Sequence, residues 1–331
     1  MLKKIGIGVA IALSLTTAAL LYLWHDRPDF EAAGVRYPAA ITATGDAARP
    51  VAVTWLGVDT LLIDDGTTQL LTDGFFSRPP LARLFLGKIS PDRAAIDRAI
   101  ARFRIDRLAA VIPVHSHYDH AFDSAEVAKR TGAKLVGSPS TANLGRGAQL
   151  PEAQIVTVTD GQTLAFGHFT VTMLVSAHAS SRSGPPLPGT IDVPLTPPAR
   201  ASAWKEGASY LILISHPQGR LAIQGSSGIK QHVTEGHAAD VLFLAMGGLT
   251  LKDPEYRARY WRTYVNGLAV RRVFPIHHED FLQPFGTVVP QPRILGDMPA
   301  TIAEIGTIAH ASGIAFELPR FGTPIAVFQN Y

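Results

Sequence analysis

The stretch AVIPVHSHYDHAFDS, residues 110–124, concentrates the chemistry of this chain. It begins with an apolar run that is typical of a buried strand and continues into a polar loop. The loop carries four side chains that can bind cations, namely His115, His117, Asp119 and His120. A lone histidine at a strand end is most often a surface group. Four ligand-type residues this close together instead predict a metal site.

The amino-acid composition restricts which metal this site can bind and which partners the chain can have. The 331-residue chain has no cysteine, so a metal must be held by histidine and carboxylate groups, a set that suits Zn²⁺. The formal net charge of +3 is small, and no stripe of arginine and lysine predicts a nucleic-acid partner. The 29 glycines and 24 prolines follow no repeat and indicate many turns.

Residues 1–28 are predicted to form a membrane anchor or a signal peptide. Two lysines precede an uncharged run from Ile5 to Trp24, long enough at about 1.5 Å per residue to cross a bilayer core. Lysines before the run favour a cytoplasmic N-terminus. The remaining chain would then face the periplasm from a bacterial-type inner membrane. Small residues near Ala18 and Ala19 leave cleavage open, which would give a periplasmic protein.

The rest of the chain divides into a linker, residues 29–49, and one domain, residues 50–331. Strand-like runs alternate with helical segments in two successive halves, which predicts an α/β fold. The expected architecture is an αββα sandwich, with two mixed sheets packed together and helices on the outer faces. One helix is expected to be capped by Ser90 and to run to about Phe103. Residues 180–207 form a long proline-rich loop, of a kind that is usually functional or disordered.

Further ligand-type residues close other apolar runs. Asp73 ends LLTDG, His178 lies in LVSAHAS, and His277 and His278 lie in FPIHHED. Strand ends on one edge of a sandwich are a common place to assemble a site, so we expect these residues near residues 115–120.

The histidine-rich motif resembles that of a known enzyme family. HSHYDH at residues 115–120 matches the HxHxDH signature of the metallo-β-lactamase-fold hydrolases, and the order of Asp73, His178 and His277 around it also matches. The opening VTWLGVDTLLIDDGTTQLLTDGFFS, residues 53–77, resembles the branch with L-ascorbate-6-phosphate lactonase and N-acylphosphatidylethanolamine phospholipase D. The resemblance covers about residues 50–290.

The resemblance implies the metallo-β-lactamase fold with one or two Zn²⁺ ions per chain. The implied ligands of the first ion are His115, His117 and His178, and those of the second are Asp119, His120 and His277. Asp73 would orient the histidine loop from behind the ligands. His278 is given no role, and we expect a solvent-facing neighbour of His277.

One position departs from the family pattern. In the family a strand ends in Gly-Asp-Thr-Gly, and that aspartate bridges both metals. The matching segment here is QGSSG, with Ser226 at the bridging position. Serine is neutral, so at least one metal site should be weakened. Glu279 and Asp280 are the candidates to compensate.

The implied function is a zinc-dependent hydrolase that uses a metal-bound hydroxide to cleave an ester, lactone or phosphodiester bond. Asp119 would be its catalytic residue and would hold or deprotonate the water. A di-iron oxidoreductase is a less favoured alternative. Such an enzyme usually needs the bridging aspartate, which Ser226 replaces here, and a flavin domain, which this chain lacks. The alternative is a catalytically degenerate envelope protein that binds a metal or a ligand, which Ser226 motivates.

The substrate is expected to be a small or lipid-like molecule. Aromatic residues near the presumed mouth would make the pocket apolar, namely Phe75, Phe76, Trp204, Phe281 and Phe285. Ordinary packing is the other explanation for these rings.

Overall fold

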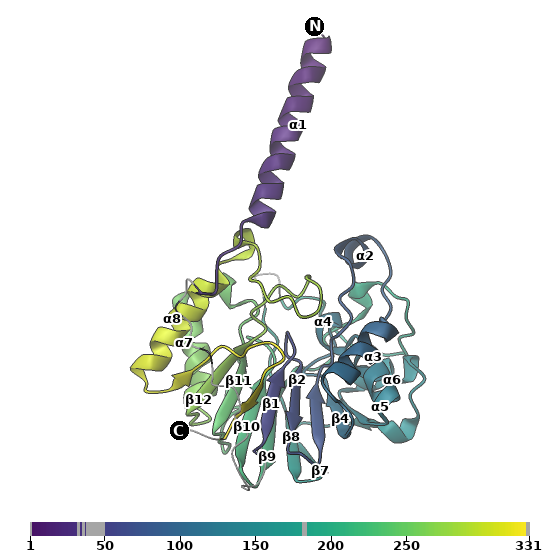
Figure 1. The fold of residues 1–331 in the computed structure, drawn as a ribbon, viewed down its shortest axis with the longest axis vertical. Coiled ribbons are helices and arrows are strands. Elements are labelled where there is room, and N and C mark those ends of the chain that lie inside the picture. The colour runs from purple at the N-terminus through teal and green to yellow at the C-terminus, as the bar shows by residue number, and fades with distance from the viewer. Residues whose placement is uncertain (1, 32–33, 35–36, 38–49, 181–183, 329–331) are drawn as a thin grey trace.

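The computed structural model describes residues 2–31, 34, 37, 50–180 and 184–328, and only the backbone of residues 2–13. Most of the predicted linker, from residue 38 to residue 49, lies outside this description. From residue 50 onward the chain forms two packed sheets with helices outside them (Figure 1).

Each sheet has seven strands. The first sheet runs, in spatial order, β14 (Pro324–Ala326), β1 (Ala52–Trp55), β2 (Leu61–Asp64), β3 (Gln69–Thr72), β4 (Leu108–Ile112), β5 (Lys134–Gly137) and β6 (Ile155–Thr157). The second runs β13 (Ala315–Phe316), β12 (Arg272–Ile276), β11 (Val241–Ala245), β10 (Gly219–Gln224), β9 (Tyr210–His216), β8 (Phe169–Val175) and β7 (Gln162–Phe166).

Eight α-helices are described. They are α1 (Leu2–His25), α2 (Leu81–Leu86), α3 (Arg93–Arg102), α4 (Tyr118–Ala121), α5 (Ser124–Thr131), α6 (Pro139–Gly147), α7 (Pro254–Trp261) and α8 (Met298–Ala311). Helix α3 begins later than predicted, because the side chain of Asp92 accepts the Ala95 N–H and caps the helix. The prediction of Ser90 as the cap is therefore wrong.

Side-chain alternation along the strands builds the layers. Ile63 and Leu70 belong to the core between the sheets, whereas their neighbours Leu62 and Leu71 pack outward in a cluster that includes residues of α3 and α5. Helices α7 and α8 cover the outer face of the second sheet in the same way. Since successive strand residues face opposite sides, each sheet has two apolar faces. This arrangement confirms the predicted αββα sandwich.

Strand direction places the site. Strands β1, β3 and β4 share one direction in the first sheet, and β8, β10, β11 and β12 share one direction in the second. The loops that follow these strands carry the residues of the site described below. Loops at the carboxyl ends of strands commonly hold ligands in folds of this kind.

Helix α1 projects away from the sandwich (Figure 1). Among the described residues, no helix is both long and apolar enough to cross a membrane. The segment after α1 contacts the domain: Arg27 pairs with Asp280 at 2.8 Å, and Phe30 is buried against His278. Cleavage and cellular location stay predictions.

Candidate metal centre

Three histidines form a near-equilateral triangle between the sheets. His115 and His117 follow β4 in the first sheet, and His178 follows β8 in the second. The ring centroids are 4.7 Å apart for His115 and His117, 4.7 Å for His115 and His178, and 4.8 Å for His117 and His178. One ligand atom from each ring lies within 4.8 Å of the other two. The structure therefore brings together the predicted ligands of the first ion.

The ring nitrogens of this triangle are arranged as in metal sites. Nε2 of His117 lies 3.3 Å from the carbonyl oxygen of Leu187, and Nδ1 of His178 donates to the carbonyl of Ala179 at 2.7 Å. Both ring nitrogens of His115 are buried without a hydrogen-bond partner. A histidine that binds a metal commonly donates its other N–H to such a carbonyl. The donor set therefore fits a divalent cation, and Leu187 gives the proline-rich loop a role in holding it.

Burial also keeps these rings in the form that binds metals. It lowers the pKa of His115 and His117, and burial together with the nearby His117 lowers the pKa of His178 to about 4. The three imidazoles are therefore neutral at pH 7, with lone pairs available to a metal.

A second group lies beside the triangle. Asp119 Oδ2 is 3.5 Å from Nε2 of His120 and 3.6 Å from Nε2 of His277. Behind His120, Asp73 Oδ2 accepts from Nδ1 at 2.8 Å, while Asp73 Oδ1 accepts the backbone N–H of Val114. Asp73 therefore contacts both the His120 ring and the backbone at Val114, and the orienting role that the resemblance implies for it stays a prediction. The ligand roles of the second group stay predictions.

The charges in this second group are strongly coupled. Burial alone would raise the pKa of Asp119, but His120 and His277 outweigh it and hold that pKa low. Burial alone would lower the pKa of His120, but Asp119 and Asp73 outweigh it and raise that pKa to about 10. An ion bound here must therefore displace a proton from His120.

Two of these residues adopt backbone conformations that are rare outside glycine. Asp73 and His277 both have φ of 53°. Unusual backbone conformations often mark functional sites. Gly247 makes room for the His277 ring, since a Cβ added there would lie 3.1 Å from it.

Ser226 lies where the resemblance places the bridging residue. It follows β10 at the same edge, and its Oγ accepts the backbone N–H of Ala179, the residue after His178, at 2.9 Å. Its hydroxyl is thus engaged with the backbone.

The two candidate substitutes for a bridging carboxylate each have other polar partners. Glu279 accepts the backbone N–H of Val58 at 2.6 Å and lies 3.7 Å from Arg78. Asp280 pairs with Arg27. The expectation that one of them compensates for Ser226 stays a prediction.

Sequence reasoning missed a carboxylate, Asp59. It is fully buried, its Oδ2 lies 3.5 Å from Nδ1 of His120, and neither of its oxygens has a hydrogen-bond partner. Burial raises its pKa to about 8. Its place in the sequence could have indicated it. Asp59 follows strand β1 in the same way that Asp73 follows strand β3, at the same edge of the sheet.

His278 differs from the prediction. It is fully buried rather than solvent-facing, and its ring stacks on Trp55 with centroids 4.6 Å apart. His277 and His278 therefore occupy different layers, although they are adjacent in sequence.

Most of the aromatic residues expected at the mouth pack in the interior. Phe75, Phe76 and Trp204 are buried, and half-buried Phe285 packs on Phe76. Phe281 is different, because its half-buried ring lies 5.6 Å from His277 and 6.3 Å from Tyr118. Phe281 and Tyr118 are therefore the aromatic rings beside the metal-site residues.

A third group of ligand-type residues is explained without a metal. Asp65, His168 and His216 lie together at the opposite end of the strands. Nδ1 of His216 accepts the backbone N–H of Gln218, so its Nε2 carries the proton, and Nε2 is the atom that faces Asp65 at 3.6 Å. Nδ1 of His168 also lies 3.1 Å from Asp65, so the three side chains contact one another directly.

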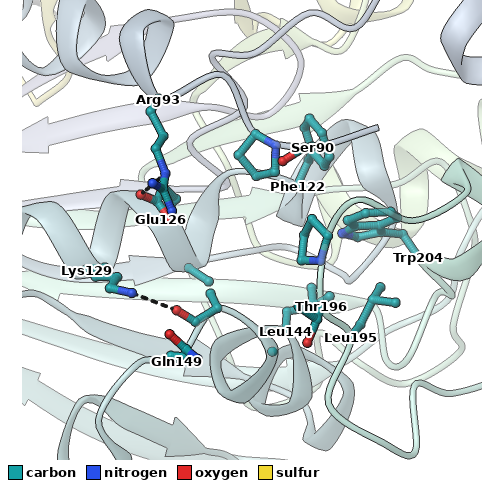
Figure 2. A pocket seen from close by; sticks show the side chains of 15 residues that line it. Ser90, Arg93, Phe122, Glu126, Lys129, Leu144, Gln149, Leu195, Thr196 and Trp204 are labelled. Atoms are coloured by element: carbon teal, nitrogen blue, oxygen red, sulfur yellow. Dashed lines mark hydrogen bonds and ion pairs between the residues drawn. The ribbon is translucent and has the colours of Figure 1, made fainter. Parts of the chain in front are cut away.

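A cavity of about 240 Å³ lies outside this centre (Figure 2). It is lined by apolar side chains such as Phe122, Leu144 and Trp204, and by the ion pair of Arg93 and Glu126 at 3.3 Å. None of the residues of the two metal-ligand groups lines it. We therefore do not assign it to the catalytic site.

Comparison with known proteins agrees with this geometry. A family model described as Metallo-beta-lactamase superfamily matches residues 53–200. The chain is a metal-dependent hydrolase with the metallo-β-lactamase fold. Among solved structures, this hydrolase resembles Igni18, a metallo hydrolase from Ignicoccus hospitalis, with a TM-score of 0.50 and 15% identity over 83% of this chain and 97% of that one. It also resembles an isothiocyanate hydrolase from Delia radicum gut bacteria, with a TM-score of 0.51 and 14% identity over 83% and 98%.

Curated relatives carry a general name. A UPF0173 metal-dependent hydrolase from Pyrobaculum calidifontis is 23% identical over 69% of this chain and 84% of its own length. One from Myxococcus xanthus is 30% identical over 40% and 41%. The narrower resemblance to the lactonase and phospholipase branch stays a prediction.

Proposed function

We propose that this hydrolase uses Zn²⁺ to cleave an ester, lactone or phosphodiester bond in a substrate with an apolar part. The observation that carries the proposal is the triangle of neutral histidines, with the open carboxylate of Asp119 beside it. A bound dication lowers the pKa of a water molecule that it holds and polarises the oxygen that gains charge.

The chain's own residues supply the remaining chemistry. His115, His117 and His178 would hold the first ion, and Asp119, His120 and His277 would hold the second. The side chain of Asp119 is 14% exposed, so it can reach a water molecule and also the reacting bond. It takes a proton as the water oxygen bonds to the acyl or phosphoryl centre. It then gives that proton to the leaving oxygen.

The apolar part of the substrate is proposed from two rings. Tyr118 and Phe281 flank the second group and are only partly buried. A preference for longer acyl or alkyl chains would follow, because a buried methylene group contributes about 0.8 kcal/mol.

A substrate panel tests the proposal. We would measure hydrolysis of p-nitrophenyl esters of increasing chain length, of aliphatic lactones, and of bis-p-nitrophenyl phosphate, with the zinc-loaded protein. We expect turnover in one class, its loss on chelation, and its loss in His117→Ala. His310→Ala is the matched control, since His310 is exposed on α8.

The competing function is metal or ligand binding without turnover. Ser226 is the observation that favours it, because a bridging carboxylate is absent at that position. Stoichiometric zinc without turnover of any substrate class would support that function and contradict ours. Full activity in His117→Ala would contradict the assigned site.

A further inference from the structure

Helix α2 is an apolar helix that the rest of the described chain does not cover. Its sequence is LARLFL, and none of its side chains is buried. Phe85 is 71% exposed and Leu86 is 83% exposed. Large apolar side chains are unfavourable in water, and a patch of them on a surface commonly marks a contact with a protein or a membrane.

A second exposed apolar pair lies where α1 joins the domain. The 3-10 helix η6 (Arg293–Leu295) carries Ile294, which is 55% exposed, and Leu295, which is 42% exposed. The backbone N–H of Arg293 donates to the carbonyl of Asp26, directly after α1, at 2.8 Å. Figure 1 shows α2 and the base of α1 at the same end of the sandwich. The two apolar patches therefore lie at the end from which α1 projects.

The exposed apolar side chains are unevenly placed along the chain. Beyond α1, each large one that is described lies in a connection that follows β3, β8, β11 or β12. Besides those of α2 and η6, they are Val193 and Leu251. Within the described residues, the connections at the opposite edge of the sheets carry none. The exposed apolar side chains therefore belong to connections that start at the edge of the candidate metal centre.

Basic side chains flank the apolar residues of α2. Arg83 and Lys88 are exposed, and residues 78–91 contain no acidic residue. Cations beside exposed apolar side chains are typical of helices that lie in a membrane interface, where the cations meet anionic headgroups. In a two-fold dimer through this face the same cations would meet their own copies, which is unfavourable. The charge therefore favours a lipid surface over a second copy of the chain.

Helix α1 adds apolar surface at the same end. Leu15, Leu20 and Leu21 are each more than half exposed. A compact protein seated on α2 would leave these side chains in water, since α1 points away from the sandwich (Figure 1). A lipid bilayer accommodates both, because its surface is continuous and its apolar interior has no fixed shape. The two features together favour a lipid partner.

We propose that α2 and η6 dock this domain on an anionic lipid bilayer, with the edge of the metal centre turned toward the lipid. Phe85, Leu86 and Ile294 enter the boundary between headgroups and acyl chains. Arg83 and Lys88 bind headgroup phosphates. One consequence rests on the proposed function: a substrate with an apolar part would pass from the bilayer to the metal centre without crossing bulk water.

A fluorescent label on α2 tests the docking. The chain contains no cysteine, so Ala82→Cys in the full chain gives one site for a polarity-sensitive label and leaves Phe85 in place. Vesicles of phosphatidylcholine and phosphatidylglycerol in equal amounts should shift the emission to the blue, and doxyl groups on the lipid chains should quench it. Ser215→Cys is the matched control, because Ser215 is exposed near the end of β9 at the opposite edge. Its label should show neither change.

Variants of the apolar and basic side chains test which groups make the contact. Phe85→Asp combined with Leu86→Asp should fold, because neither side chain is buried. This variant should lose the blue shift and the quenching at position 82, even where α1 keeps the chain on the vesicle. Ser215→Asp should retain both. On vesicles of phosphatidylcholine alone the wild-type shift should be smaller, and an equal shift would contradict docking through headgroup charge.

Two further results would overturn the proposal. One is a label at position 82 that stays in a polar environment, whether the chain is bound to the vesicles or fails to bind them. The other is a blue shift that appears without lipid and grows with protein concentration, which would assign the surface to a second copy of the chain. Neither measurement uses hydrolysis, so the docking and the proposed function fail separately.

Discussion

At the scale of single residues, the centre is built from side chains whose charge states oppose one another. Burial keeps His115 and His178 neutral, while Asp119 and Asp73 keep His120 protonated at neutral pH. The two halves of the site therefore differ in how strongly protons compete with metal.

This difference predicts an order of metal loss with pH. The pKa of His178 is lowered to about 4, so protons compete for the first site only in acid. The pKa of His120 is raised to about 10, so the second ion must displace a proton at every lower pH. Acidification should therefore remove the second ion first. Metal content after dialysis at a series of pH values measures this, and loss of the first ion at the higher pH would contradict it.

Asp119 is the residue whose loss should affect chemistry more than folding. Asp119→Asn keeps the size of the side chain and removes its basic oxygen. We expect kcat to fall about 10²- to 10⁴-fold, with the first ion retained. Steady-state kinetics beside zinc analysis measure both quantities. An unchanged kcat would exclude Asp119 as the proton carrier.

The ligand-type residues could be named from sequence because they lie in one short motif or directly at strand ends. Asp59 could not, because an aspartate in a turn carries no motif and its burial depends on packing between distant segments. The burial of His278 depends on Trp55 and Phe30, which come from other parts of the chain. Local sequence could not predict either environment.

At the scale of elements, the site depends on how closely two strand ends from opposite sheets approach. Gly225 follows β10 in the second sheet, and Val114 lies after β4 in the first. A Cβ at Gly225 would lie 2.3 Å from the Cβ of Val114, closer than packed atoms allow. The absence of a side chain at Gly225 therefore lets the His115 loop and the Ser226 loop meet.

Gly225→Ala should separate these loops. We expect a loss of about 1–3 kcal/mol in the free energy of unfolding, as is typical of overpacking, together with weaker metal binding. Gly306→Ala is the control, because its added Cβ would make only an ordinary contact at 3.4 Å in helix α8. That control should gain about 0.5–1 kcal/mol. Denaturant unfolding compares the two, and equal stability would contradict the argument.

Most elements could be predicted from periodicity and caps. Helix α7 begins after Asp253 and α5 ends at Gly132, as their caps indicate. The sequence does not decide where helix α3 begins, because Ser90 and Asp92 are both residue types that cap helices well. The hydrogen bond from the Ala95 N–H to the Asp92 side chain decides between them. Strand pairing between distant segments, such as β14 with β1, left no local signal.

At the scale of the whole molecule, the N-terminal segment decides where the hydrolase acts. We predict export, with the domain on the periplasmic side or free in the periplasm. The contacts of Arg27 and Phe30 with the domain would survive cleavage near Ala19, since both lie beyond it. A reporter that is active only outside the cytoplasm, fused to the full chain, measures this. Reporter activity confined to the cytoplasm would contradict it.

The proposed hydrolysis requires that two groups of side chains at the sheet edge hold metal ions. Elemental analysis of the zinc-loaded full chain tests it most directly, with His117→Ala and His310→Ala measured in parallel. We expect about two ions per chain in the wild type and in His310→Ala, and about one in His117→Ala. A wild-type chain that retains no zinc after reloading would contradict it.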